Sequence, residues 1–158
     1  MTLTIISLIL LTAYIAYAVI YCGMPSSLSD TYYQLEKHDR KKGLFQIAMI
    51  LPAFLLLPAW LECSMENIQF LAFLSCGGLI FVGAAPCFKL ELDGKVHYAS
   101  AAVCGFSAVL WVILSGMWYI PLVAFAIAIY LMIKYKNWMF WVECAAFLST
   151  YLAVLLCS

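Results

Sequence analysis

The feature that most constrains this chain is a series of six long apolar segments joined by short polar loops. They lie at about residues 2–22, 43–61, 68–86, 97–115, 118–135 and 138–157. A helix needs roughly 20 apolar residues to cross about 30 Å of hydrocarbon, so each segment predicts one membrane span. Six spans would use about 120 of the 158 residues. We therefore expect an all-α membrane bundle, with one transmembrane domain over residues 1–158.

The composition agrees with a bilayer protein and narrows its partners. Hydrophobic residues make up 67% of the chain and charged residues 10%, against about 45–50% and about 25% in soluble domains. The net charge is zero and no long Lys/Arg run occurs, so we expect no nucleic-acid partner. The seven cysteines form no CxxC motif and no Cys/His cluster. We therefore expect neither a metal centre nor a cofactor.

The first apolar segment has one alternative interpretation, a cleaved signal peptide. Ala16-Tyr17-Ala18 resembles a cleavage site. However, no Lys or Arg precedes the apolar run, and the run is about as long as a full span. A first transmembrane helix is the favoured interpretation.

The loop over residues 23–42 is the most polar stretch of the chain. Ser29 or Asp30 is of the residue types that cap helices, which predicts a short helix after it. Tyr32, Tyr33 and Leu35 would then face the membrane surface.

The loop over residues 88–98 carries a different signal. Asp93-Gly94 stands between alternating residues, a pattern typical of a two-residue hairpin turn. We expect a short two-stranded β-hairpin here, between the third and fourth spans.

All eight basic residues fall in alternate loops, which predicts the orientation. They are Lys37, Arg40, Lys41 and Lys42 after the first span, Lys89 and Lys95 after the third, and Lys134 and Lys136 after the fifth. Because cytoplasmic loops collect Lys and Arg, we expect these loops in the cytoplasm and both termini on the non-cytoplasmic side.

Small residues predict where helices approach most closely. The fourth span carries Ala101 and Gly105, and also Ser100, Cys104 and Ala108, at four-residue spacing. Close approach through small residues drives helix association in lipid. We expect the tightest contact between this span and the Gly-rich third span, and such faces are also suited to a homo-oligomer.

Four polar residues form the candidate site. Glu143 lies inside the last span, where a charge is costly and is a functional candidate by default. His97 opens the fourth span, and we expect the loop with Ser29 and Asp30 to fold back near it. The structural alternatives are a Glu143 that snorkels to the interface and a His97 satisfied by a loop carbonyl.

Two segments carry a resemblance to a known family. Pro25-Ser26-Ser27-Leu28-Ser29-Asp30-Thr31 precedes Gly43-Leu44-Phe45 at the second span, and His97-Tyr98-Ala99-Ser100-Ala101-Ala102 opens the fourth. With the six-span layout, they resemble the DRAM-type autophagy modulators and their bacterial relatives. The resemblance implies a role around membrane lipids without agreed catalytic residues. It also implies a luminal Ser-Asp loop, whereas the basic residues predict a cytoplasmic one.

These features favour a non-enzymatic protein that binds or organises membrane lipid, because no catalytic motif is present. Two alternatives remain open. An intramembrane lipid-modifying hydrolase would use His97 as a general base beside Ser29 and Asp30. A small transporter or channel subunit would place Glu143 along its path.

Overall fold

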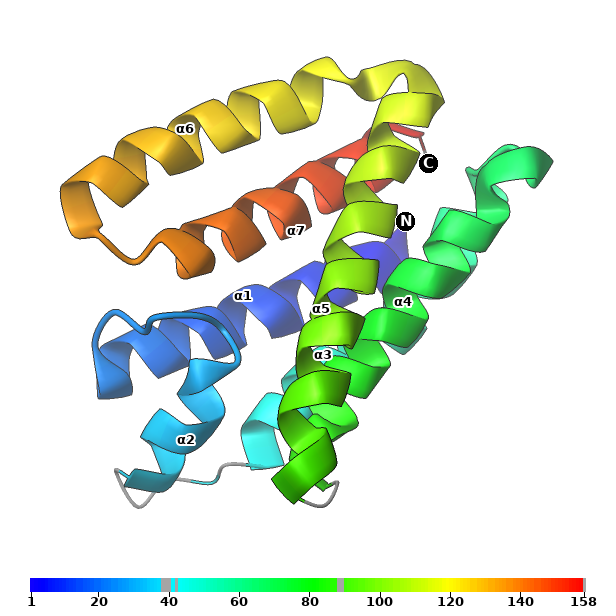
Figure 1. The fold of residues 1–158 in the computed structure, drawn as a ribbon. Helices are drawn as coiled ribbons and strands as arrows, with labels where there is room; N and C mark the ends of the chain where they lie inside the picture. Colours follow the sequence, from blue (N-terminus) through cyan, green and yellow to red (C-terminus); the bar gives the residue numbers. More distant parts are fainter. Residues whose placement is uncertain (38–40, 42, 88–89, 158) are drawn as a thin grey trace.

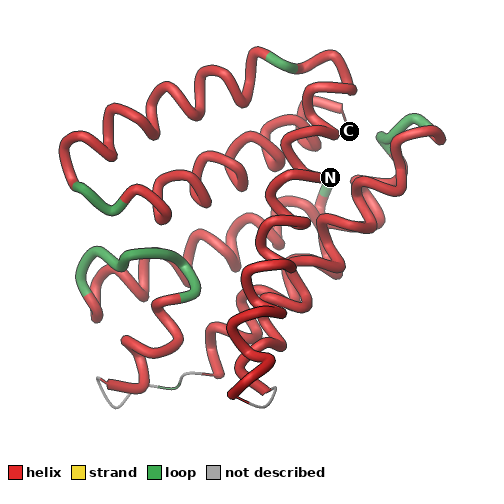
Figure 2. Tube along the Cα trace, in the orientation of Figure 1, coloured by secondary structure: helices red, strands yellow, loops and turns green. Residues whose placement is uncertain are grey.

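The computed structural model describes residues 1–37, 41, 43–87 and 90–157, which are helical except at short connections (Figure 2). The long helices are α1 (Thr2–Cys22), α3 (Gly43–Glu62), α4 (Gln69–Ala84), α5 (Leu90–Val112), α6 (Tyr119–Tyr135) and α7 (Trp138–Cys157). The shorter elements are α2 (Asp30–Lys37), η1 (Glu66–Ile68), η2 (Ala85–Cys87) and η3 (Ile113–Met117). The predicted all-helical fold is confirmed for the described residues, and five of its apolar helices have the length of a membrane span.

The helices have the length and surface of a membrane protein. Five stretches of 20–24 residues are long and apolar enough to cross a bilayer, while α6 has 17 residues, or about 26 Å. Large apolar side chains face outward, such as Ile20 (75% exposed), Phe106 (71%) and Ile133 (79%). Soluble monomers rarely expose large apolar patches. The chain is therefore a multi-pass helical protein suited to a lipid environment.

The helices form two groups that cross (Figure 1). α6 and α7 run antiparallel, with α1 beside α7 and α3, whereas α3, α4 and α5 pack together across them. Both termini lie at one end of the bundle. α2, the start of α3 and the start of α5 lie at the other end, which we call the loop end.

α4 and α5 form the most extensive helix contact, which confirms the prediction from small residues. A Cβ added to Gly78 would lie 2.7 Å from the carbonyl oxygen of Ser100 and 2.9 Å from the backbone nitrogen of Cys104. Nearby, the Ser75 Oγ donates a hydrogen bond to the Cys104 carbonyl oxygen at 3.1 Å. The two backbones approach this closely because Gly78 has no side chain.

The hairpin prediction over residues 88–98 is wrong for the described residues of that loop, because α5 already begins at Leu90. Phe88 and Lys89 lie outside the described residues. A lone two-stranded hairpin is marginal in water, whereas the first turns of α5 extend a helix that is packed further along. As a consequence, His97 lies within α5 rather than at its start.

The short helix predicted in the first loop is α2, but its orientation differs from the prediction. Leu35 is fully buried in the bundle instead of facing the membrane surface, while Tyr33 is exposed. The reason is a buried polar link, in which the Tyr14 hydroxyl contacts the Thr31 Oγ1, which donates to the Leu28 carbonyl oxygen. This link turns one face of α2 against α1.

The connection between α5 and α6 is a tight turn. Gly116 adopts a φ of 81°, which a residue with a Cβ rarely adopts. The chain reverses there within a few residues, and α6 runs back along α7.

Cysteine labelling tests the orientation. Cys157, at the end of α7, donates a hydrogen bond to the Cys63 carbonyl oxygen at 3.4 Å, and both thiols are free. Burial raises the pKa of the Cys63 thiol to about 12. Because maleimides react with the thiolate, we expect a membrane-impermeant maleimide on intact cells to label Cys157 readily and Cys63 slowly, while sparing Cys87 at the loop end.

The Cys63 reaction has a further signature in its pH dependence. Below the pKa, each pH unit raises the thiolate fraction about tenfold, so the rate at Cys63 should rise about a hundredfold from pH 7 to pH 9. Detergent-solubilised protein, in which Cys87 and Cys157 are both accessible, is the control. External labelling of Cys87 with protection of Cys157 would reverse the orientation.

Candidate functional site

The four predicted site residues line one cavity of about 430 Å³ at the loop end of the bundle. Ser29 and Asp30 come from the first loop and the start of α2, His97 from α5, and Glu143 from α7. We call this space the mouth cavity. Three segments distant in the sequence therefore bring their polar side chains to one place.

The first loop is held against α7 by three hydrogen bonds. The Leu28 backbone nitrogen donates to the Glu143 Oε2 at 2.6 Å. The Phe140 backbone nitrogen donates to the Ser26 carbonyl oxygen at 3.2 Å. The Asn137 Nδ2 donates to the Met24 carbonyl oxygen at 2.9 Å. The loop therefore packs along the start of α7 and forms one wall of the mouth cavity.

Asp30 and the serines stabilise the loop from within. The Asp30 Oδ2 accepts hydrogen bonds from the Ser26 backbone nitrogen at 3.3 Å and from the Ser26 Oγ at 2.9 Å. The Ser27 Oγ accepts from the Asp30 backbone nitrogen at 3.1 Å and lies 3.0 Å from the Ser29 Oγ. Ser27, rather than Ser29 or Asp30, therefore caps α2.

His97 lies half-buried across the mouth cavity from the loop, with its ring 5.7 Å from that of Tyr98. Among the described residues, the hydrogen bonds of Ser29 and Asp30 stay within the loop and α2. The expected approach of the loop to His97 is therefore a shared cavity, since the described hydrogen bonds of Ser29 and Asp30 do not include His97.

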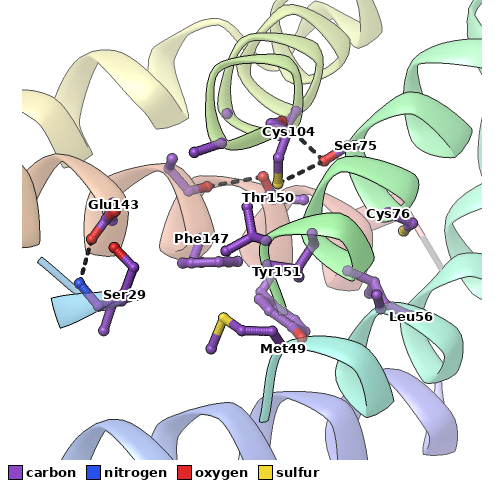
Figure 3. A pocket seen from close by; sticks show the side chains of 18 of the residues that line it. Ser29, Met49, Leu56, Ser75, Cys76, Cys104, Glu143, Phe147, Thr150 and Tyr151 are labelled. Carbon is purple, nitrogen blue, oxygen red and sulfur yellow. Dashed lines mark hydrogen bonds between the residues drawn. The ribbon is translucent and has the colours of Figure 1, made fainter. Parts of the chain in front are cut away.

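A second cavity of about 80 Å³, which we call the inner cavity, is shown in Figure 3. It adjoins the mouth cavity. The two share four lining residues: Ser29, Phe45, Ala101 and Glu143. Along α3 its lining runs from Phe45 to Trp60, fifteen residues apart or about 22 Å. The stretch of α3 that lines the cavity is therefore longer than the roughly 15 Å that one leaflet contributes to a hydrocarbon core of about 30 Å.

The two cavities differ in chemistry. The inner cavity is lined mostly by apolar side chains, such as Met49, Leu56 and Phe147, whereas the mouth cavity gathers serines and two carboxylates. Within the described part of the chain, Glu143 forms no ion pair with Lys or Arg, and no group of His, Cys, Asp and Glu is placed to hold a metal ion. The result is an amphipathic internal space that leads from a polar mouth to an apolar interior.

Three comparisons with known proteins add no relative to this picture: no family model, no curated protein and no solved structure matches the chain. The fold and the site together define a class, a multi-pass helical membrane protein with an amphipathic internal cavity.

The sequence singles out four residues of the inner cavity, but for helix packing and not for a cavity. Ala101, Cys104, Gly105 and Ala108 were assigned to helix packing, and all four also line the inner cavity. Their small side chains at four-residue spacing leave room on one face of α5. Asn137 was not predicted to hold the loop, and a lone amide in a two-residue connection was the available signal.

Proposed function

We propose that this chain is a membrane protein that binds a lipid, with the head group in the mouth cavity and a segment of an acyl chain in the inner cavity. The observation that carries the proposal is the junction of the two cavities at Ser29, Phe45, Ala101 and Glu143. A lipid has the same polarity, a polar end joined to a long apolar end. The resemblance to DRAM-type proteins, with their proposed roles around lipids, points the same way.

Packing rather than hydrophobicity would drive the acyl chain of the lipid into the inner cavity. Lipid tails are as apolar as the bundle interior, so transfer from the bilayer gains little hydrophobic free energy. An unfilled space loses the dispersion contacts of its lining, and an acyl chain restores them. Polar contacts in the mouth cavity would then hold the head group in place.

The proposal includes six membrane crossings. Both termini lie at one end of the bundle, which an even number of crossings requires, so α6 would cross although it is shorter than the others. Lys134 and Lys136 close α6 at the loop end, where Lys37 ends α2. By the positive-inside rule, the mouth cavity would open toward the cytoplasmic leaflet.

A matched pair of glycine substitutions tests lipid binding. A Cβ at Gly105, which lines the inner cavity, would meet no atom within 4 Å, and the same holds at Gly77, which does not line either cavity. We expect Gly105→Leu to fill the inner cavity and to lower co-purified lipid by at least about fivefold, because its side chain replaces part of the acyl chain. Lipid mass spectrometry of the purified protein measures this.

Gly77→Leu is the control, since it makes the same change in helix propensity without filling a cavity. It should retain lipid at the wild-type level. Equal lipid content in the two variants and the wild type would count against the proposal.

The two alternative functions have less support. A hydrolase needs a nucleophile beside its general base. The described hydrogen bond of the Ser29 Oγ, however, is to the Ser27 Oγ and not to His97. A transporter is favoured by one observation, that Glu143 lines a cavity. The polarity change from the mouth cavity to the inner cavity fits a lipid better than a water-filled ion path.

A further inference from the structure

We propose that the head group in the mouth cavity carries a primary ammonium, so that the ligand is an amine-bearing lipid. This inference rests on the proposed function and specifies its ligand. The ammonium would be held by the carboxylates of Asp30 and Glu143. Both line the mouth cavity, Asp30 from the first loop and Glu143 from α7.

Two carboxylates that line the mouth cavity have unused hydrogen-bond acceptors. The Glu143 Oε2 accepts from the Leu28 backbone nitrogen, and the Asp30 Oδ2 accepts from the loop and from Gln34. Within the described part of the chain, the other oxygen of each carboxylate accepts no hydrogen bond. A carboxylate accepts and cannot donate, whereas a primary ammonium offers three donors. The two remaining carboxylate oxygens are therefore suited to accept hydrogen bonds from an ammonium.

The charges that line the mouth cavity favour a cation. Among the described residues that line the mouth cavity there is no Lys or Arg, and two carboxylates are present. A phosphate placed there would meet like charges, whereas an ammonium would meet opposite ones, and this attraction is stronger away from water. Lys95 is exposed and follows Gly94, which lines the mouth cavity. A phosphate attached to the amine would lie outward, toward such lysines.

The aromatic lining of the mouth cavity also suits a cation. Tyr33, Tyr98 and Trp138 line the same cavity. Aromatic rings attract cations, and both a primary and a trimethylated ammonium gain from this contact. Hydrogen bonds to carboxylates separate the two, because a trimethylated ammonium has no N–H to donate. The mouth cavity should therefore prefer the primary amine.

A lipid panel tests the inference. The lipid-free wild-type protein in mild detergent is titrated, by native mass spectrometry, with dioleoyl phosphatidylethanolamine, phosphatidylcholine and phosphatidylglycerol, and with sphingosine. We expect phosphatidylethanolamine to bind at least about tenfold more tightly than phosphatidylcholine or phosphatidylglycerol, the effect of losing charge-assisted hydrogen bonds. Tight binding of sphingosine as well would assign recognition to the amine alone, and its weak binding would assign it to the amine with its phosphate.

Two conservative variants locate the preference. Glu143→Gln keeps an acceptor for the Leu28 nitrogen and removes the charge, and it should bring phosphatidylethanolamine to the affinity of phosphatidylcholine. Asp30→Asn should act in the same direction, and it provides the test if the first variant does not fold. Glu66→Gln removes a carboxylate from η1 at the opposite end and should keep the wild-type preference.

The outcomes separate this inference from the proposed function. Equal binding of phosphatidylethanolamine and phosphatidylcholine, or tightest binding of phosphatidylglycerol, would overturn the ammonium assignment while leaving lipid binding intact. A preference that survives in both Glu143→Gln and Asp30→Asn would also overturn it. Failure of every lipid to bind the wild-type protein would overturn the proposed function itself.

Discussion

Trp111→Ala is expected to lower the free energy of unfolding by about 3–5 kcal/mol, the usual cost of removing a fully buried tryptophan. Trp111 is 0% exposed and packs edge to face with Trp60, with the ring centroids 5.3 Å apart. Its Nε1 donates a hydrogen bond to the Ser64 Oγ at 2.8 Å. The substitution would leave a large void beside Trp60, which lines the inner cavity.

Trp118→Ala is the matched control. Trp118 follows η3 and is 59% exposed, so its removal should change stability by no more than about 0.5 kcal/mol. Unfolding by sodium dodecyl sulfate in mixed micelles, followed by circular dichroism, compares the two variants. Equal losses at the two positions would contradict the packing described here.

Gly78→Ala is expected to lower the free energy of unfolding by about 1–3 kcal/mol, a typical cost of overpacking. Its Cβ would lie 2.7 Å from the Ser100 carbonyl oxygen and 2.9 Å from the Cys104 backbone nitrogen. Both are backbone atoms, so α4 and α5 must move apart to accept the methyl group. The separation would also weaken the hydrogen bond from Ser75 to Cys104.

The adjacent residue supplies the control for this substitution. A Cβ at Gly77 would meet no atom within 4 Å. Alanine is favoured over glycine in a helix by about 1 kcal/mol, so Gly77→Ala should be neutral or stabilising. The same unfolding measurement decides, and a Gly78→Ala variant as stable as the wild type would show that the two helices are not in close contact.

The six long helices could be predicted because the length of an apolar run is a strong constraint in a bilayer. The segment ends were predictable where a special residue marks them, as Gly116 does. The start of α5 was not, because Asp93-Gly94 is a local turn signal and the outcome depended on the helix that follows. Leu35 was misplaced for a similar reason, since the buried Thr31 decides which face of α2 meets the bundle.

The candidate site could be predicted in part. Glu143 could be predicted because a carboxylate is costly inside an apolar span. Its partner could not, because the Leu28 backbone nitrogen is present in every residue type but proline. The inner cavity could not be foreseen either. Its volume depends on how side chains from α3, α4, α5 and α7 fail to fill a shared space, and Ala101 and Gly105 fit close packing equally well.

Photo-crosslinking shows whether an acyl chain enters the inner cavity. An amine-bearing lipid with a diazirine at the end of its acyl chain is added to the protein in nanodiscs, irradiated, and the adducts are mapped by mass spectrometry. We expect adducts on residues that line the inner cavity, such as Met49 and Phe147, and we expect these adducts to be lost in Gly105→Leu. Adducts confined to outward-facing side chains, such as Phe106 and Ile133, and unchanged in Gly105→Leu would contradict the entry of an acyl chain into the inner cavity.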